Sequence, residues 1–330
     1  MPVLNSSNPT LADVAARLDD KGNIDSIVEM LTETNEILED ATWIEANGFG
    51  EHKTTVRSGL PQGTWRLLNY GVQPEKSSVV SIKDSLGMLE TYAQVDKALA
   101  DLNNNSAQWR LSEERAFVEG MNQTMASTLF YGDSATHPER FTGLAPRFNS
   151  KAAENGQNII DAGGTGNDLT SVWLVVWGPT TLHGLYPKGS KAGLQIQDLG
   201  ENTVTDANGG MYQAYRTHYK WNAGLTLRDW RYVVRIANID HRALTKDGKA
   251  GADLIDLMTQ AVEMLPNANM GRAVFYCNRR IRSFLRRQIA NRVIASTLTM
   301  DTVAGKAVMS FDGVPVKRSD ALLLTESQVK

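Results

Sequence analysis

The sequence contains a single cysteine, Cys277, among 330 residues. One thiol cannot form an internal disulfide and cannot supply a cysteine-based zinc cluster, so neither kind of cross-link is expected to stabilise the fold. Cys277 ends the apolar stretch AVFYC (273–277), where a thiol behaves as a small hydrophobic side chain. We therefore expect a protein that folds in a reducing, cytoplasmic setting around an ordinary hydrophobic core.

Long apolar runs and an excess of basic residues are also missing. No stretch reaches the roughly 20 apolar residues that a membrane helix needs, and the N-terminus lacks the apolar core of a signal peptide. The 34 Lys and Arg against 37 Asp and Glu give a net charge of −3. Proteins that grip nucleic-acid backbones usually carry a clear positive excess. We expect no membrane insertion and only weak contact with nucleic acid.

Motifs that would support catalysis are absent or out of context. GLYPKGSK (184–191) has its serine before its lysine, the reverse of a phosphate-binding loop, and DAGGTGND (161–168) precedes an apolar strand rather than a helix. The five histidines lack metal-ligand spacing, and no G-x-S-x-G motif occurs. The acid pairs Asp161/Asp168 and Asp253/Asp256 could serve a hydrolase, although most chains of this length contain such pairs. No catalytic, cofactor-binding or metal-binding residue is predicted.

Two segments carry strongly opposed charge. Residues 1–50 hold ten acids and two bases, whereas residues 271–292 hold seven arginines and no acid. Both segments could simply be solvated helix faces. Alternatively, the arginines could contact nucleic acid, or an acidic arm could meet the basic helix within a chain or between copies. The residues expected in such an acid–base contact are Glu33, Glu36, Arg279, Arg282 and Arg286.

The first half of the chain predicts an arm, a hairpin and a long helix. Amphipathic helices are expected at about 10–19 and 25–40, and residues 51–90 alternate β-branched and aromatic stretches with turn formers, as in a long hairpin. A hairpin this long needs a partner surface for its apolar residues. Those expected at an interface are Trp65, Leu67, Leu68, Val79 and Ile82. A helical stripe is read at 92–102, and a long helix at 112–131 is expected to start at an N-cap, Ser112.

The second half predicts mainly strands, with two further helices. VWLVVWGP (172–179) is a continuous apolar run typical of a strand buried on both faces, and residues 212–240 are rich in strand formers. Helices are expected at about 252–265 and 279–292. The stretch FDGVPVKRSDALLLTE (311–326) predicts a terminal strand inserted into a sheet begun much earlier. Strands and helices in separate blocks indicate the α+β class.

Several stretches resemble the major capsid proteins of tailed bacteriophages, which share the Johnson, or Hong Kong ninety-seven-like, fold. FYCNRRIRSFLRRQ (275–288) resembles the strand-then-helix element of the family's axial domain, and FDGVPVKRSDAL (311–322) resembles its closing strand. A podovirus-type branch is suggested by the three stretches TTVRSGLPQGTWRLLNYG (54–71), FYGDSATHPERFTGLAPRFN (130–149) and YPKGSKAGLQIQDLG (186–200).

The resemblance implies a division of the chain and a function. The expected parts are an N-terminal arm (1–50), an extended hairpin loop lying over an adjacent subunit (51–90), a peripheral domain (91–157) with spine helix 112–131, an axial domain (158–300) and closing C-terminal strands (301–330). The implied function is that of a structural protein without enzymatic activity. It would self-assemble in the host cytoplasm into the icosahedral shell of a virion that encloses double-stranded DNA.

The resemblance also implies partners. These are copies of the chain in hexamers and pentamers, a portal, a separate scaffolding protein because the hairpin begins so near Met1, and a decoration protein in some members. Two alternatives remain open from the sequence. The same fold could form an encapsulin-like nanocompartment around cargo enzymes, or the chain could be a soluble hydrolase that uses one of the acid pairs.

Overall fold

The structure is a computed structural model and describes residues 32–101, 106–206, 208–244, 251–291, 298–303 and 306–330. The strands are β1 Trp43–Glu45, β2 Glu51–Gly59, β3 Ser78–Asp96, β4 Ile159–Asp161, β5 Leu169–Trp177, β6 Leu182–Tyr186, β7 Gln195–Thr205, β8 Met211–Leu227, β9 Val233–Asp240, β10 Arg272–Cys277, β11 Leu298–Val303, β12 Lys306–Phe311 and β13 Val314–Arg318. The α-helices are α2 Ile37–Asp40, α3 Lys97–Ala100, α4 Ser106–Tyr131, α5 Leu144–Arg147, α6 Leu254–Glu263 and α7 Arg279–Asn291.

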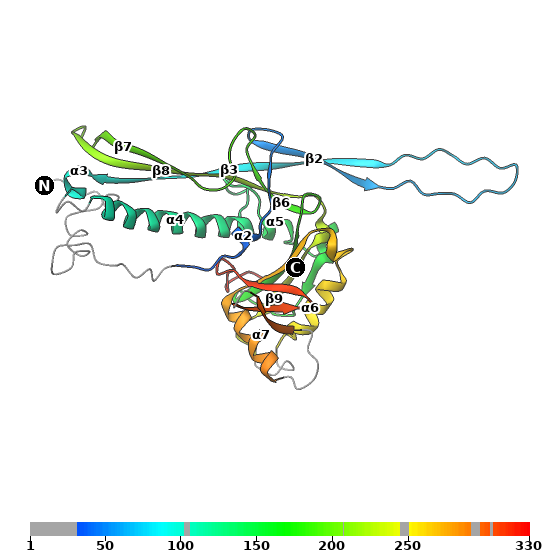
Figure 1. Cartoon of the computed structure of the whole chain (residues 1–330). Coiled ribbons are helices and arrows are strands. Elements are labelled where there is room, and N and C mark those ends of the chain that lie inside the picture. Colours follow the sequence, from blue (N-terminus) through cyan, green and yellow to red (C-terminus); the bar gives the residue numbers. More distant parts are fainter. Residues whose placement is uncertain (1–31, 102–105, 207, 245–250, 292–297, 304–305) are drawn as a thin grey trace.

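The strands form one connected sheet in the order β11-β12-β13-β10-β5-β6-β8-β3-β2, with β1, β4, β7 and β9 paired beside this path. Figure 1 shows two parts: an elongated layer of β7, β8, β3 and β2 with α4 running beneath it, and a compact part that carries β9, α6 and α7. Strands and helices gather in separate blocks, so the predicted α+β class is confirmed.

Strand β5 joins the two parts because both of its faces are buried. All nine of its residues are buried, as the apolar run in the sequence predicted. Successive side chains of a strand point to opposite faces. Trp173, Val175 and Trp177 therefore enter one hydrophobic core. Leu174 and Val176 enter a second core, which α6 and α7 cover. The strand acts as a shared wall between the two cores.

Helix α4 packs one apolar stripe against the elongated layer. Met121, Met125 and Leu129 recur at helical spacing and are buried in the core that also contains Trp173 and Tyr219. The helix begins at Ser106 instead of near residue 112, so the predicted N-cap was wrong. Residues 106–111 include no glycine or proline that would stop the helix from extending toward the N-terminus.

The helical stripe read at 92–102 was also wrong over most of its length. Strand β3 continues to Asp96, and within the described residues 92–101 only the four residues of α3 are helical. Long-range pairing overrides the local pattern here, because β3 pairs with β8 along its whole second half. Tyr92 lies opposite His218, and their rings stack with centroids 4.4 Å apart.

The N-terminal helices are tested only in part. The helix expected at 10–19 and the first seven residues of the one expected at 25–40 lie outside the described residues. Within 32–40 only α2 is helical. Residues 33–36 are not helical, and Asn35 forms a bridge with Ser319. An isolated bridge to a residue far along the chain therefore forms here in place of the expected helix.

The C-terminal stretch closes the sheet, as predicted. Asp312 and Gly313, with φ of 49° and 76°, form the tight turn between β12 and β13, and β13 then pairs in parallel with β10. Beyond it, Glu326 enters the interior and forms an ion pair with Arg235 at 2.8 Å. Hydroxyl groups of Tyr131 and Ser171 also donate to this carboxylate. The last residues thus tie together α4, β5 and β9.

Replacing Glu326 by alanine is expected to lower the free energy of unfolding by about 3–5 kcal/mol, because Arg235 would remain buried without a counter-charge. Urea unfolding of the unassembled chain measures this change. Glu201→Ala is the matched control. Its pair with Lys97 is exposed and screened by solvent, so we expect a much smaller loss. Equal losses in the two variants would contradict the assigned role of Glu326.

Candidate subunit-interface surfaces

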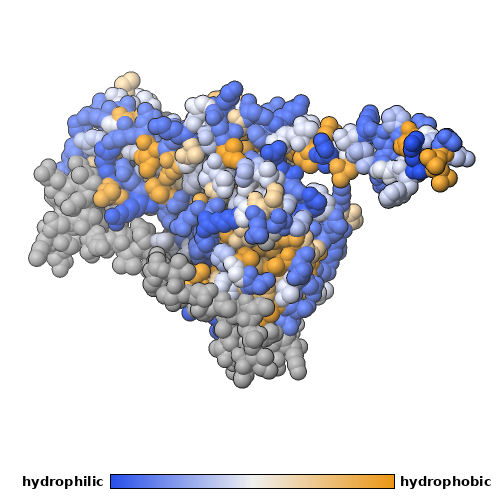
Figure 2. Space-filling view, turned by 45° about the vertical axis from the view of Figure 1, so that its right-hand side comes forward, coloured by the Kyte–Doolittle hydropathy of each residue, from blue (hydrophilic) through white to orange (hydrophobic). Residues whose placement is uncertain are grey.

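The hairpin of β2 and β3 projects from the body and carries apolar side chains at its tip. Strands β2 and β3 pair antiparallel, and between them residues 60–77 extend to the end of the projection (Figure 1). Trp65 is 100% exposed and Leu68 is 87% exposed, and Leu67 and Tyr70 beside them are also exposed. Figure 2 shows a small hydrophobic group at the end of the projection, surrounded by hydrophilic residues. Large aromatic and aliphatic groups without contacts are typical of a surface that another protein covers.

The two strand residues predicted at the same interface lie on opposite faces of the hairpin. Val79 pairs with Arg57, whereas Ile82 pairs with Thr54. Because side chains alternate along a strand, residues three apart cannot face the same surface. Val79 is exposed and Ile82 is half-buried. One flat partner therefore cannot cover both, and the hairpin would need neighbours on two sides.

The base of the hairpin is fixed by a buried carboxylate. Asp84 accepts a hydrogen bond at 2.8 Å from Arg147, which follows α4 in the chain, and another from the hydroxyl of Thr226 on β8. Next to this group the rings of His52 and His183 meet edge to face, with centroids 6.2 Å apart. These contacts hold β2 and β3 against the body and set the direction of the projection.

An apolar groove, which the sequence gave no reason to expect, runs between α4 and β3. It consists of two adjoining hollows of about 410 and 220 Å³ that share Leu89 and Thr124. The main apolar side chains that line it are Leu89, Phe117, Met121, Met125 and Phe141. A signal for the groove was visible in the sequence only as small residues, Ala116 and Gly120, on the outer side of the α4 stripe.

A second groove, lined by arginines, lies along α7. Its volume is about 490 Å³, and its lining residues are Arg279, Arg282, Ser283, Arg286, Arg287 and Arg318. The structure therefore brings together the three arginines predicted from the sequence, Arg279, Arg282 and Arg286. They share one side of α7 because they lie three and four residues apart. The opposite side, with Ile281 and Leu285, is buried in the second core.

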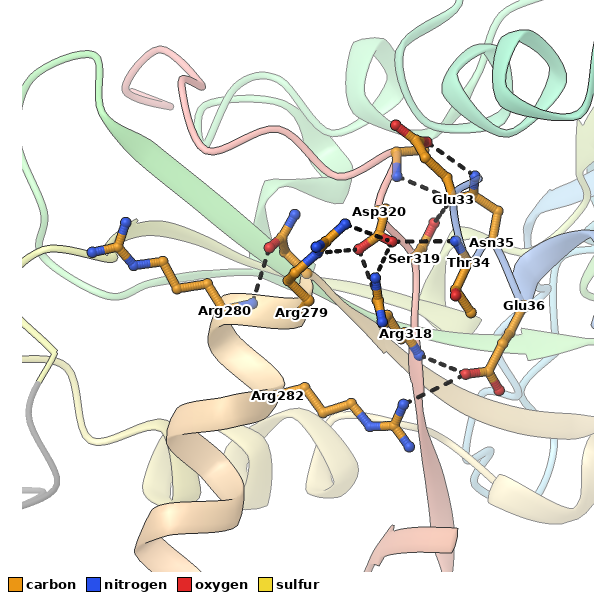
Figure 3. Close-up of polar contacts among 12 residues, drawn as sticks. Glu33, Thr34, Asn35, Glu36, Arg279, Arg280, Arg282, Arg318, Ser319 and Asp320 are labelled. Atoms are coloured by element: carbon orange, nitrogen blue, oxygen red, sulfur yellow. Dashed lines mark hydrogen bonds and ion pairs between the residues drawn. The ribbon is translucent and has the colours of Figure 1, made fainter. Parts of the chain in front are cut away.

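Glu33 and Glu36 reach this region from the same chain (Figure 3). Glu36 lies 3.6 Å from Arg282, and its carboxylate also accepts the backbone N–H of Arg318 at 3.2 Å. Glu33 instead directs its backbone N–H to Glu119 on α4, at 2.9 Å. Within the described chain, then, the acid–base contact of Glu36 is intramolecular. Whether these residues also meet a neighbour stays a prediction.

Asp320 organises the rim of the arginine groove. Burial alone would raise the pKa of its carboxyl, but hydrogen bonds from Arg318, the Thr34 backbone and Arg279 outweigh burial and lower the pKa. It is therefore charged at neutral pH and holds residue 34 of the arm segment beside the first turn of α7.

The acids considered for hydrolysis have structural partners. Asp161 pairs with Lys151, and Asp168 lies 2.9 Å from Arg242. Asp253 caps α6 by accepting backbone N–H groups of residues 255 and 256.

Burial raises the pKa of Cys277 to about 12, so its thiol is inert. In the part of the chain that the structure describes, no three acids, histidines or cysteines cluster as metal ligands would. No helix there is long and apolar enough to cross a membrane.

Comparisons with known proteins agree on one family. The model of the family described as major capsid protein GP7 matches residues 19–330. A chain of the solved structure of bacteriophage Epsilon15 is 37% identical, with a TM-score of 0.73, over 100% of this chain and 99% of that chain. No curated protein sequence matches.

More distant structures show the fold alone. The capsid of bacteriophage JBD30 is 12% identical, with a TM-score of 0.51, over 89% of this chain and 93% of that chain. The SrpI encapsulin of Synechococcus elongatus is 14% identical over 70% of this chain and 96% of that chain. Its TM-score of 0.45 is too low to support an argument.

Acid is expected to loosen the hairpin base. Burial lowers the pKa of His183 to about 4 and also lowers that of His52. The folded state thus favours neutral rings, and the stability present above pH 6.5 is lost as the pH falls toward 4. At 1.4 kcal/mol per pKa unit, and allowing for solvent, we expect a loss of about 2 kcal/mol. Urea unfolding at pH 7 and pH 5 should show a larger loss for the native chain than for His183→Gln. The same loss in both would contradict this role.

Proposed function

Because the chain belongs to the major capsid protein GP7 family and is thus a structural subunit of the icosahedral shell of a phage, we propose that its hairpin tip binds the apolar groove between α4 and β3 of a neighbouring copy. The observation that carries this proposal is the pairing of two complementary surfaces on one chain. One is a projecting tip whose apolar side chains are exposed, and the other is an apolar hollow that no described element of the chain covers.

The geometry favours a neighbour over the chain's own body. Figure 1 shows the hairpin pointing away from α4, so the tip of a chain does not reach its own groove. A knob and a hollow at different places on one surface form a heterologous contact, in which each copy receives one partner and reaches another. Such contacts generate rings and curved lattices rather than closed pairs. This is the arrangement that a shell of identical subunits needs.

The energetics favour assembly only when many contacts form together. Burying one large apolar side chain contributes about 1.5–3 kcal/mol. The free energy gained by burying Trp65, Leu67 and Leu68 is therefore no larger than the cost of the translational and rotational freedom that two subunits lose on association. A single hairpin contact is weak, whereas a closed ring repeats it in every subunit. The same weakness allows wrongly placed subunits to leave a growing shell.

We also propose a division of the chain into parts, the partners of the subunit and the content of the shell. The parts of the chain are the arm (1–50), hairpin loop (51–90), peripheral domain (91–157), axial domain (158–300) and closing strands (301–330). Subunits form hexamers and pentamers in the host cytoplasm, with a scaffolding protein and a portal, and catalyse no reaction. The shell encloses double-stranded DNA, and a net charge of −3 suits a container that holds its genome without binding it tightly. Finding DNA rather than cargo enzymes in purified particles would support this reading over a cargo-filled nanocompartment.

Replacing the tip residues by acids tests the hairpin contact. Trp65→Asp/Leu67→Asp is expected to reduce the yield of particles at least tenfold, because charged groups cannot enter an apolar groove without a partner. Electron microscopy and sedimentation measure the yield. Gln62→Asp/Gln73→Asp is the matched control, since it adds the same charge to exposed polar positions of the tip. Native yield from the Trp65/Leu67 variant would contradict the proposal.

The groove is tested separately by Thr124→Asp, at an exposed α4 position that lines both hollows. We expect it to lower particle yield as the tip variant does, while circular dichroism of the unassembled chain stays unchanged because Thr124 is exposed. Ser127→Asp, at an exposed α4 position that does not line the groove, should assemble more efficiently than Thr124→Asp. If both α4 variants assembled equally well, the hairpin would have to bind elsewhere.

A further inference from the structure

We propose that the arginine groove on α7 binds the acidic N-terminal segment, residues 13–29, of a second copy of this chain. The proposal rests on the proposed function in that it requires copies of the chain to assemble. It adds a second contact, electrostatic in character and separate from the hairpin. The groove lies on the compact part of the molecule, far from the hairpin tip (Figure 1).

The groove carries more positive charge than the described residues of the same chain neutralise. Five guanidinium groups line it, and the carboxylates that contact them are Glu36 and Asp320. Arg286 and Arg287 are exposed and form no ion pair with any other described residue. Like charges held close together on one helix repel each other. An anionic partner that entered the groove would remove this repulsion and gain charge-assisted hydrogen bonds.

The N-terminal segment has the matching chemistry. Within residues 1–31 there are five acids and two bases, a net charge of −3. The acids are Asp13, Asp19, Asp20, Asp25 and Glu29. Arginine binds carboxylates through two parallel hydrogen bonds, which lysine cannot do, and every basic residue of the groove is an arginine. A short acidic peptide therefore satisfies the groove better than a diffuse negative surface would.

The direction of the chain favours a second copy as the source of this segment. Glu36 lies beside Arg282, residue 34 lies beside Asp320 at the start of α7, and Glu33 already contacts α4 (Figure 3). Toward its N-terminus the chain thus moves away from the second half of α7. Arg286 lies about 10 Å further along the helix than Arg279, in the opposite direction.

Duplex DNA fits the groove less well. A nucleic-acid site needs a basic track that follows successive phosphates. Here the basic surface is short, and Glu36 and Asp320 lie at its rim, where they would repel a phosphate backbone. A peptide whose acids are interrupted by Arg17 and Lys21 can place carboxylates on the arginines and its own basic groups near these rim acids.

Peptide binding to the unassembled full chain tests the groove without requiring a shell. The probe is a fluorescein-labelled peptide of residues 10–31, and anisotropy measures its dissociation constant. We expect Arg286→Glu/Arg287→Glu to weaken binding at least tenfold and Arg231→Glu/Arg242→Glu, at exposed arginines outside the groove, to change it less than twofold. A peptide with its five acids changed to amides should bind at least tenfold more weakly. Equal binding of the peptide to the native chain and to the groove variant would overturn the proposal. It would also be overturned if a DNA duplex displaced the peptide and the binding of that duplex required Arg286 and Arg287.

Cross-linking in particles tests whether the contact joins two copies. A Glu29→Cys chain and a longer, tagged Arg286→Cys chain are co-expressed, and Cys277 does not compete because it is buried. We expect a disulfide-linked pair of unequal mass, at least tenfold above the level for Glu29→Cys with Arg231→Cys. If well-formed particles contained no more of this linked pair than the control, the proposal would be overturned and the hairpin contact would still stand. The same holds if a cross-link formed only within a single chain that carries both cysteines. Failure of the native chain to form particles would count against the shell proposal, while peptide binding would still decide the groove.

Discussion

The burial of β5 on both faces is the constraint on which the rest of the structure depends. Its alternating side chains enter two separate cores, so the strand cannot shift by one residue without exchanging the two sets. Its neighbours β9 and β10 are fixed by pairing with it, and β13 is fixed through β10. Register in the compact part, and the path of the C-terminal stretch, therefore follow from one strand that has no solvated face.

A rigid centre allows the periphery to be incomplete. Buried carboxylates connect the outer elements to the body: Asp40 binds Lys317 and Arg272 at 2.6 Å each, and Asp84 holds the hairpin base through Arg147. Each of these charges has its partners within the chain. The hairpin tip, by contrast, exposes apolar groups, and the α7 groove exposes arginines. The unsatisfied groups thus lie at the edges of the molecule, where another copy can supply what is missing.

The two incomplete surfaces suit different roles in assembly. Apolar contact is non-directional and strengthens with buried area, so the proposed contact of hairpin and groove would provide cohesion. Contact between charges acts over about 10 Å at moderate salt and guides approach and orientation more than it adds affinity. A subunit that carries both can be oriented by its charges and then held by its apolar tip.

The sequence by itself determined the features that depend on local pattern. The apolar run of β5, the stripe of α4, the turn at Asp312 and the exposed tip around Trp65 could all be predicted, because periodicity and turn chemistry act over a few residues. Only the tertiary structure decided that β3 continues through Tyr92, that Val79 and Ile82 face opposite ways, and that α4 and β3 enclose an apolar groove. It also decided that Arg235 and Glu326 meet in the interior. These features depend on which distant strands pair and in which register, and that choice minimises the free energy of the whole chain rather than of any one segment.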